Sequence, residues 1–297
     1  MSTLSASSTT STSSTSRGSN TSMRTQARAG RWLNSTILLI ISIATVYPFV
    51  WMILTSIRES NSVFGGSFLP ERITFDAYAR VLEFTGFIGH YWNSIWMTVA
   101  TCSIVLVLAT LCGYSFAKLR FPFKNTIYIA LLSTLMMPGT ALIIPVYLQL
   151  RTFGLLDTQL GLIIVYASGA APFSMFLMRA FFESLPDELV HAARVDGAGE
   201  LIVFLRVVLP LARPGIATVL IFQFLTTWNE FLMANTILQS PEKLPLQPIL
   251  FSLQGEYSTD WTTLSAGLTL SAIPVVLVYV FLQRQFVAGM TLGAVKS

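Results

Sequence analysis

The sequence predicts an all-α membrane protein with six transmembrane helices, and three observations lead to this fold class. Hydrophobic residues make up 53% of the 297 residues, charged residues make up only 11%, and the mean hydropathy is +0.66. A soluble domain carries roughly 25% charged residues, so the composition is that of a membrane protein. Six apolar segments each reach the ~20 residues that a helix needs to cross a bilayer. A polar stretch around residues 184–214 interrupts them.

The six apolar segments are separated by shorter polar connections. They occupy residues 33–57, 93–117, 126–148, 159–181, 215–238 and 263–283. Several contain proline, at Pro48, Pro138, Pro145, Pro172 and Pro274. A bilayer tolerates proline in a helix where neighbouring groups satisfy the freed carbonyl. These prolines therefore either kink helices for packing or break helices that line a pathway.

The chain divides into a tail and a membrane domain. Residues 1–30 are predicted to be a disordered cytoplasmic tail, because their Ser- and Thr-rich sequence cannot bury apolar surface. They do not resemble a signal peptide, since no hydrophobic run begins before Leu33. Residues 31–297 are predicted to be one transmembrane domain. Within it, residues 58–91 form an extracytoplasmic lobe in which FLPERITFDAYARVL predicts a turn followed by an amphipathic helix.

The basic residues predict the orientation. With the N-terminus inside, 13 of the 18 Lys and Arg residues lie on the inner side of the membrane. Positive charge is enriched in cytoplasmic loops, so we expect a multi-pass plasma-membrane protein with both termini in the cytoplasm. The polar stretch at residues 184–214 is then cytoplasmic as well. The net charge of +4 gives no indication of nucleic-acid binding.

No motif in the sequence indicates catalysis or cofactor binding. A helix would place Cys102 and Cys112 about 15 Å apart, too far for a disulfide bond. The sequence contains no metal-ligand spacing, Walker A phosphate-binding loop, nucleophile elbow or HExxH pattern. We therefore expect the chain not to be an enzyme and to hold no metal or cofactor of its own.

The polar stretch predicts two short helices joined by a turn. Ser184 is a candidate N-cap, and Asp187 and Glu188 suit the positive end of a helix dipole. Gly197 is a candidate left-handed C-cap. A helix between these ends would place Leu189, Ala192, Ala193 and Asp196 on one face. The two alanines on that face leave room for another surface to approach closely, which is typical of a docking element.

The sequence HAARVDGA, followed by VVLP at residues 207–210, resembles the EAA-loop signature of ABC importer permeases. In that family the loop is the cytoplasmic coupling helix that sits in a groove of the ATPase subunit. His191 stands where the motif usually has its glutamate, and Glu188, one turn earlier, is a candidate to replace it. The resemblance implies that residues 182–214 are a coupling loop. The contact residues it implies are Glu188, His191, Ala192, Ala193, Asp196, Gly197 and Ala198.

Further stretches resemble the carbohydrate-uptake members of the same family, similar to the smaller permease subunit of maltose-type transporters. They are IIPVYLQLRTFGLLDTQLGLIIVY, PFSMFLMRAFFESLPDEL, WNEF and QRQFVAGMTLGAVK. The resemblance covers most of the chain after about residue 30. It implies a type I ABC importer permease fold and a carbohydrate substrate. It also implies three partners: a dimer of ATPase subunits that binds ATP and Mg²⁺, a second homologous permease subunit, and an extracellular solute-binding protein.

The candidate substrate path lies in the fifth apolar segment. A charged residue such as Glu230 costs about 3 kcal/mol at mid-bilayer, so its side chain must face protein or water, or be protonated. Together with Trp228 and Asn229 it either borders the path of a sugar or bonds to a neighbouring helix and holds two permease subunits together. Gln223 lies seven residues earlier on roughly the same face and is a further candidate.

Three alternatives remain at this stage. Within the importer class, the cargo could be a phosphorylated polyol or another polar solute. An ion-coupled secondary transporter would need several intramembrane carboxylates or matched broken helices, and Glu230 alone is available. A membrane scaffold would have no pathway at all.

Overall fold

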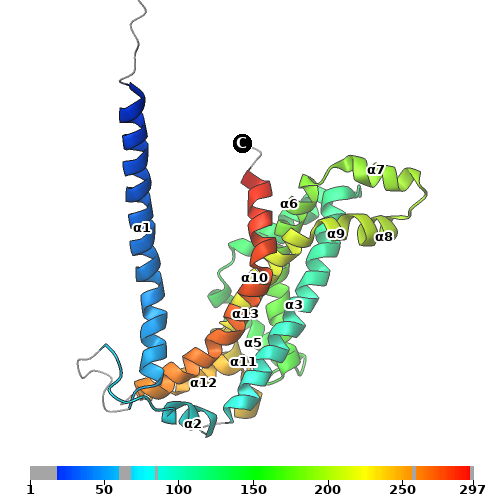
Figure 1. The fold of residues 1–297 in the computed structure, drawn as a ribbon. Coiled ribbons are helices and arrows are strands. Elements are labelled where there is room, and N and C mark those ends of the chain that lie inside the picture. Colours follow the sequence, from blue (N-terminus) through cyan, green and yellow to red (C-terminus); the bar gives the residue numbers. More distant parts are fainter. Residues whose placement is uncertain (1–18, 60–67, 84–85, 256–258, 295–297) are drawn as a thin grey trace, which may run out of the picture. The chain divides into compact units, whose positions relative to one another are not determined.

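A computed structural model describes residues 19–59, 68–83, 86–255 and 259–294, and their regular structure is entirely helical (Figure 1). The chain separates into two compact units, Met1–Trp51 and Met52–Ser297. Each is described by itself below.

The first unit consists of most of helix α1 (Ser19–Ser56). Its segment Asn34–Ser56 is long and apolar enough to cross a membrane, and residues 34–51 are exposed throughout. A helix that is apolar on all sides needs lipid or another chain around it. Of the tail predicted to be disordered, residues 1–18 lie outside the described residues, and residues 19–30 are helical instead. The Ala, Arg, Met and Gln residues there favour helix and extend the apolar helix without a new nucleation step.

The second unit is built on long helices that run between its two ends. They are α3 (Phe87–Lys118), α6 (Gln159–Ser184), α10 (Arg213–Trp228) and α13 (Trp261–Ala294). The most extensive helix contact joins α3 to α6. Gly113 permits this contact, because a Cβ atom at that position would lie 2.8 Å from Cβ of Met178.

Shorter elements connect the long helices. The predicted amphipathic helix is α2 (Asp76–Glu83), which packs against α13. Between α3 and α6 the chain forms α4 (Lys124–Ser133), η2 (Thr134–Met136), η3 (Gly139–Leu142) and α5 (Ile143–Thr152). Between α6 and α10 it forms α7 (Asp187–Val195), α8 (Glu200–Ile202), the π-helical turn η4 (Val203–Val208) and α9 (Leu209–Leu211). Between α10 and α13 it forms α11 (Leu232–Ile237), η5 (Pro241–Lys243) and α12 (Leu246–Ser252).

The described residues contain four helices long and apolar enough to span a membrane, and six spans if each of two bent helix pairs counts as one. The third predicted span is broken by a 93° bend between Lys124–Met136 and Gly139–Thr152. Met137 is extended there, as expected before Pro138, whose ring excludes the helical conformation. The fifth predicted span is also interrupted, because α10 ends at Trp228 and α11 begins at Leu232.

Separate hydrophobic clusters stabilise the two ends of the second unit. At the end that carries α2 and α12, Trp228 lies in a cluster with Phe87, Leu246 and Leu250 (Figure 1). His90 is buried there, with Nδ1 2.9 Å from the carbonyl oxygen of Leu244. At the opposite end, a cluster joins the chain between α6 and α10 to the ends of the long helices.

Candidate functional site

The chain between α6 and α10, residues 185–212, forms a ledge at one end of the second unit, with α7 outermost (Figure 1). We call it the α6–α10 loop. It contains all the residues predicted to contact an ATPase.

The ends of α7 are defined by backbone geometry. Ser184 is not the N-cap as predicted, because it is the last residue of α6 and its hydroxyl donates to the Phe181 carbonyl at 2.7 Å. Pro186 occupies the N-cap position instead. At the other end Gly197 is left-handed, with φ 84°, as predicted. The N–H groups of Gly197 and Ala198 donate to the carbonyls of Arg194 and Ala193, each at 3.0 Å, which is a Schellman motif.

The inward side of the α6–α10 loop has a hydrophobic core of its own. Val190 of α7 and Phe204 of η4 are both buried in the cluster that contains Tyr114 of α3 and Phe182 of α6. The Tyr114 ring lies 5.1 Å from that of Phe204 and 6.1 Å from that of Phe182, measured between ring centroids. A closely packed interior resists deformation, so the loop is held as a body against α3 and α6.

Polar contacts join the same elements. Lys118 Nζ, at the end of α3, lies 2.6 Å from Oδ1 of Asp187 and donates to the Leu185 carbonyl at 2.8 Å. Glu200 accepts from Arg194 Nε at 2.8 Å and from the Tyr114 hydroxyl at 2.9 Å. The hydrogen bond from Lys118 lowers the pKa of the Asp187 carboxyl, so this ion pair is formed at neutral pH.

The outward side of α7 carries most of the predicted contact residues. Glu188, His191, Ala192, Asp196 and Gly197 are exposed. Ala193 and Ala198 are half-buried and pack against the hydrophobic cluster. The prediction that Ala192 and Ala193 share one docking face is therefore corrected, because Ala193 follows Val190 at a spacing of three and turns inward with it. Leu189 and Val195 are also outward, with 43% and 87% of their surface exposed.

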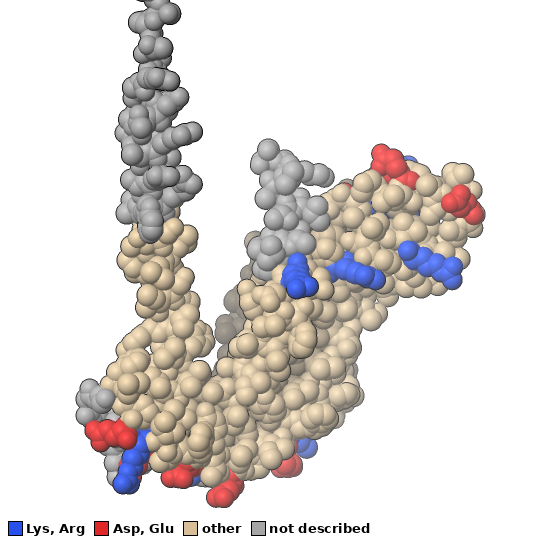
Figure 2. Space-filling view, in the orientation of Figure 1, with Lys and Arg blue, Asp and Glu red and all other residues tan. Residues whose placement is uncertain are grey.

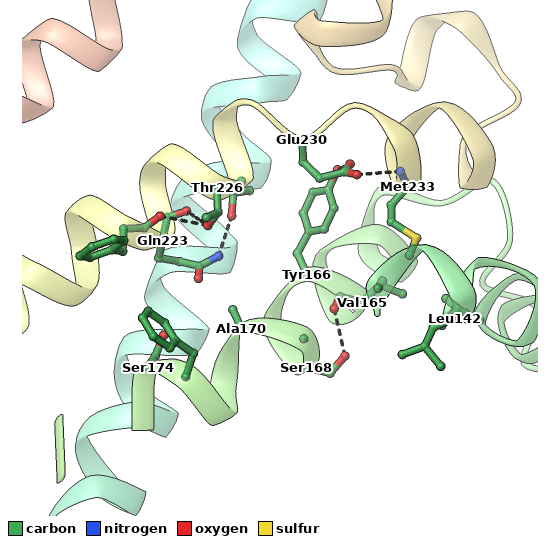
Figure 3. Close-up of a pocket in the computed structure, with 16 residues that line it drawn as sticks. Leu142, Val165, Tyr166, Ser168, Ala170, Ser174, Gln223, Thr226, Glu230 and Met233 are labelled. Atoms are coloured by element: carbon green, nitrogen blue, oxygen red, sulfur yellow. Dashed lines mark hydrogen bonds between the residues drawn. The ribbon is translucent and has the colours of Figure 1, made fainter. Parts of the chain in front are cut away.

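A second feature is a cavity of about 460 Å³ between the broken helix, α6 and the end of α10 (Figure 3). Gln223 and Glu230 line it, as do Tyr166 and Ser168 of α6. Its remaining lining is mostly apolar and includes Leu142, Val146, Phe173, Phe222 and Met233. Two of the four predicted path residues therefore reach one cavity.

Glu230 is bonded within its own chain as well as lining the cavity. One oxygen, Oε2, accepts from the Tyr166 hydroxyl at 2.5 Å and from the Ala234 N–H at 3.1 Å. The other, Oε1, accepts from the Met233 N–H at 2.7 Å (Figure 3). The carboxylate thus caps the first turn of α11 and ties the α10–α11 break to α6. These three donors give the Glu230 carboxylate the hydrogen bonds that the hydrocarbon of a bilayer cannot supply.

The other two predicted path residues do not line the cavity. Trp228 is 2% exposed, stacks on Phe224 at 5.6 Å between centroids and donates from Nε1 to the Ser271 carbonyl at 3.2 Å. It is a core residue between α10 and α13. Asn229 is exposed but its amide donates to the Leu225 carbonyl at 2.9 Å, at the end of α10. Neither residue lines the cavity, because α10 ends one residue before Asn229 and Glu230 turns away from Trp228.

Gln223 is buried and donates from Nε2 to the Thr227 hydroxyl at 2.7 Å. Its position on the face of α10 that meets the cavity agrees with the predicted helical spacing (Figure 3).

Sequence reasoning did not find the residues that hold the α6–α10 loop in place. Lys118 and Asp187 are far apart in the chain, as are Tyr114 and Glu200, so no local pattern indicates either pair. No three His, Cys, Asp or Glu side chains within the described ranges are grouped so that they could hold a metal ion.

Together these features define a multi-pass membrane subunit with a rigid ledge at one end and a cavity beside a broken helix. The chain belongs to the family described as binding-protein-dependent transport system inner membrane component, which matches residues 105–292. It is therefore a transport permease of an inner membrane and not an enzyme. Membership of this family decides against the two alternatives named above, an ion-coupled secondary transporter and a membrane scaffold.

The similar proteins include the diacetylchitobiose uptake system permease protein NgcG of Streptomyces coelicolor, which is 33% identical over 89% of this chain and 88% of the relative. The trehalose transport system permease protein SugB of Mycobacterium tuberculosis is 32% identical over 84% of this chain and 92% of its own length. Among solved structures, a chain of a bacterial ABC transporter involved in the import of alginate matches with a TM-score of 0.79 and 30% identity, over 88% of this chain and 98% of that one. The fold is therefore that of an ABC importer permease.

Proposed function

We propose that this chain is the permease subunit of an ATP-driven importer that carries a mono- or oligosaccharide, with the α6–α10 loop as its contact to the ATPase. The observation that carries the proposal is the construction of that loop. Its inward side is packed and ion-paired to α3 and α6, while α7 leaves Leu189, His191, Ala192 and Val195 exposed. Exposed apolar side chains on a rigid support are typical of a protein-binding surface. The coupling residues are then Glu188, His191, Ala192, Asp196 and Gly197 at the surface, with Ala193 and Ala198 supporting them.

The partners of the chain follow from this assignment. A dimer of ATPase subunits binds ATP and Mg²⁺, and this chain holds neither. A second homologous permease subunit completes the pathway, and an extracellular solute-binding protein delivers the cargo at the end that carries α2 and the lobe of residues 58–91. Both termini and the α6–α10 loop then face the cytoplasm, and residues 31–297 form the permease domain. The direction of the positive-charge bias supports this orientation.

The same contacts suggest how ATP drives transport. Closure of the ATPase dimer displaces α7, and the cluster around Tyr114 and Phe204 passes this movement to α3, α6 and α10 as one body. Transport requires that nucleotide binding favours one of two permease states over the other. A rigid loop transmits the displacement, whereas a flexible loop would absorb it.

The cavity is our candidate for this subunit's share of the pathway. Gln223 and Glu230 contribute polar groups, Tyr166 contributes an aromatic ring, and the lining is otherwise apolar. This combination suits a sugar, whose hydroxyl groups form hydrogen bonds and whose C–H faces pack on apolar or aromatic surface. The relatives named for diacetylchitobiose, trehalose and galactooligosaccharides support a carbohydrate cargo.

Reconstitution of the complete transporter tests the proposal. The chain is assembled in nanodiscs with its second permease, ATPase and binding protein, and ATP hydrolysis is measured with each of a panel of mono- and oligosaccharides. We expect hydrolysis that rises with one class of sugar, together with ATP-dependent uptake in proteoliposomes. Stimulation of ATP hydrolysis by a phosphorylated polyol but by no sugar would mean that the cargo is a phosphorylated polyol. Uptake that needs no ATP would overturn the function.

A further inference from the structure

The part of the α6–α10 loop that returns toward the long helices has two different sides. We call it the return segment, Glu200–Leu211. Val203, Phe204 and Val208 are buried in the cluster shared with α7, α3 and α6. Its other side exposes four large apolar residues, which are Leu201 at 65%, Ile202 at 47%, Leu205 at 48% and Leu211 at 45%. Since α7 packs against the buried side, this exposed side is turned away from α7.

Two arginines accompany the exposed apolar side chains. Arg206 lies within the return segment, Arg213 begins α10 two residues after its end, and both are exposed. Within the described part of the chain, neither guanidinium has a hydrogen bond or ion pair, whereas Arg194 and Lys118 of the same end both pair with carboxylates. Most of the exposed acidic residues of the loop lie on α7 and at its C-terminal end, at Asp187, Glu188 and Asp196, whereas Glu200 at the start of the return segment is paired with Arg194. Figure 2 shows most of the Lys and Arg side chains of this end along its lower edge, and the Asp and Glu side chains on its upper edge and at its tip.

The direction of the return segment agrees with a position at the membrane surface. It meets Arg213–Trp228 at a bend of 75°, so it runs nearly perpendicular to that helix. If α10 crosses the bilayer, the return segment lies almost in the plane of the bilayer. A segment in that plane, with leucines on one side and arginines among them, places the apolar side chains at the acyl boundary and the arginines among the phosphates.

We propose that the exposed side of the return segment binds the inner leaflet, with Arg206 and Arg213 contacting the headgroups of anionic phospholipids. The segment then acts as an interfacial anchor that sets the height of α7 above the membrane. The exposed carboxylates of α7 are repelled by the same anionic surface. The arginines of the return segment and the carboxylates of α7 therefore both favour the orientation in which the return segment faces the membrane and α7 faces away from it. The proposal rests on the proposed function in one respect, namely that this end of the chain faces the cytoplasm.

Fluorescence quenching in the assembled transporter tests this placement. Cys102 and Cys112 are first replaced by alanine, and a bimane label is attached either at Leu205→Cys on the return segment or at Leu189→Cys on α7. In nanodiscs we expect doxyl-labelled phosphatidylglycerol to quench the label at position 205 and iodide to quench it weakly. We expect doxyl-labelled lipid not to quench the label at position 189, because α7 lies farther from the membrane. Strong iodide quenching at position 205 overturns the proposal. Protection from both quenchers also overturns it, because another subunit then covers the segment.

The role of the arginines is tested by lipid selectivity. At equal mole fraction, doxyl phosphatidylglycerol should quench the label at position 205 more strongly than doxyl phosphatidylcholine. Replacing Arg206 or Arg213 by glutamine should lower this preference by about fivefold for each residue. Arg151→Gln is the matched control. Arg151 is an exposed arginine in the last turn of α5, outside the return segment, so we expect its replacement to leave the lipid preference unchanged. Equal quenching by the two lipids in the parent protein contradicts a lipid-headgroup site. These readouts do not depend on transport, so they fail independently of the proposed function.

Discussion

Nζ of Lys118, at the end of α3, lies 2.6 Å from Oδ1 of Asp187, the first residue of α7. The lysine side chain is only 6% exposed, and its other acceptor is the Leu185 carbonyl. Removing the carboxylate therefore leaves a buried cation with one neutral partner, which is more costly than losing an exposed ion pair. The contact joins a membrane helix to the surface proposed to meet the ATPase.

We predict that Asp187→Asn loosens α7 and lowers the number of sugar molecules transported per ATP hydrolysed, several-fold, in reconstituted proteoliposomes. The amide keeps the size of the side chain but cannot neutralise Lys118. Glu183→Gln is the control, because Glu183 is an exposed carboxylate near α7 whose ion pair, to Arg179 of the same helix, does not join two elements. An equal effect of the two substitutions would mean that negative charge at this end of the chain, and not the attachment of α7 to α3, sets the coupling.

The pH dependence of this ion pair has a defined sign. The hydrogen bond from Lys118 lowers the pKa of Asp187 below its ordinary value of 3.8. A carboxyl group with a lowered folded-state pKa contributes its full stability above the unfolded pKa and loses it as the pH falls through the folded pKa. We therefore expect the difference in hydrogen exchange of α7 between the parent protein and Asp187→Asn to persist from neutral pH to about pH 5. A difference that disappears between those two pH values would contradict the assignment.

Gly197 and Gly199 provide a matched pair for testing the rigidity of the loop. Gly197 has φ 84°, whereas Gly199 has φ −69°, and a Cβ atom at either position meets no other atom within 4 Å. Gly197→Val forces a β-branched residue into the left-handed region, at a cost of order 1–3 kcal/mol. We expect it to uncouple sugar-stimulated ATP hydrolysis from uptake at normal expression, and Gly199→Ala to behave like the parent protein. Normal uptake in Gly197→Val would count against transmission through this turn.

Tyr166 and Glu230 should act as a unit. Tyr166→Phe removes one donor to the carboxylate, and Glu230→Gln removes the charge that caps α11. We expect each substitution to lower thermal stability and the double variant to cost less than the sum, by about 1 kcal/mol or more, since both remove the same contact. Additive losses would show that the two residues do not interact. A change in the apparent affinity for sugar in Tyr166→Phe would support the cavity as part of the path.

The local features were predictable from the sequence, because they depend on neighbouring residues. Composition and the lengths of the apolar segments indicated an all-α membrane fold, an amphipathic helix was predicted within residues 68–82 where α2 lies, and Gly197 was predicted to be left-handed. The break at Pro138 was one of two interpretations that the sequence left open, and the break after Trp228 was missed. Apolar composition does not distinguish a continuous helix from one interrupted before Pro138 or after Trp228.

By itself, then, the sequence determined where the apolar segments fall, that Gly197 ends a helix, which residues carry charge, and which motif the α6–α10 loop resembles. The tertiary structure alone decided which side of each element is buried. It turned Ala193 inward and left Ala192 outward, placed Trp228 in the core and Glu230 at a cavity, and joined Lys118 to Asp187. The physical reason is that helical spacing defines faces but not what each face meets. Contacts between residues so distant in the chain exist only once the helices have packed.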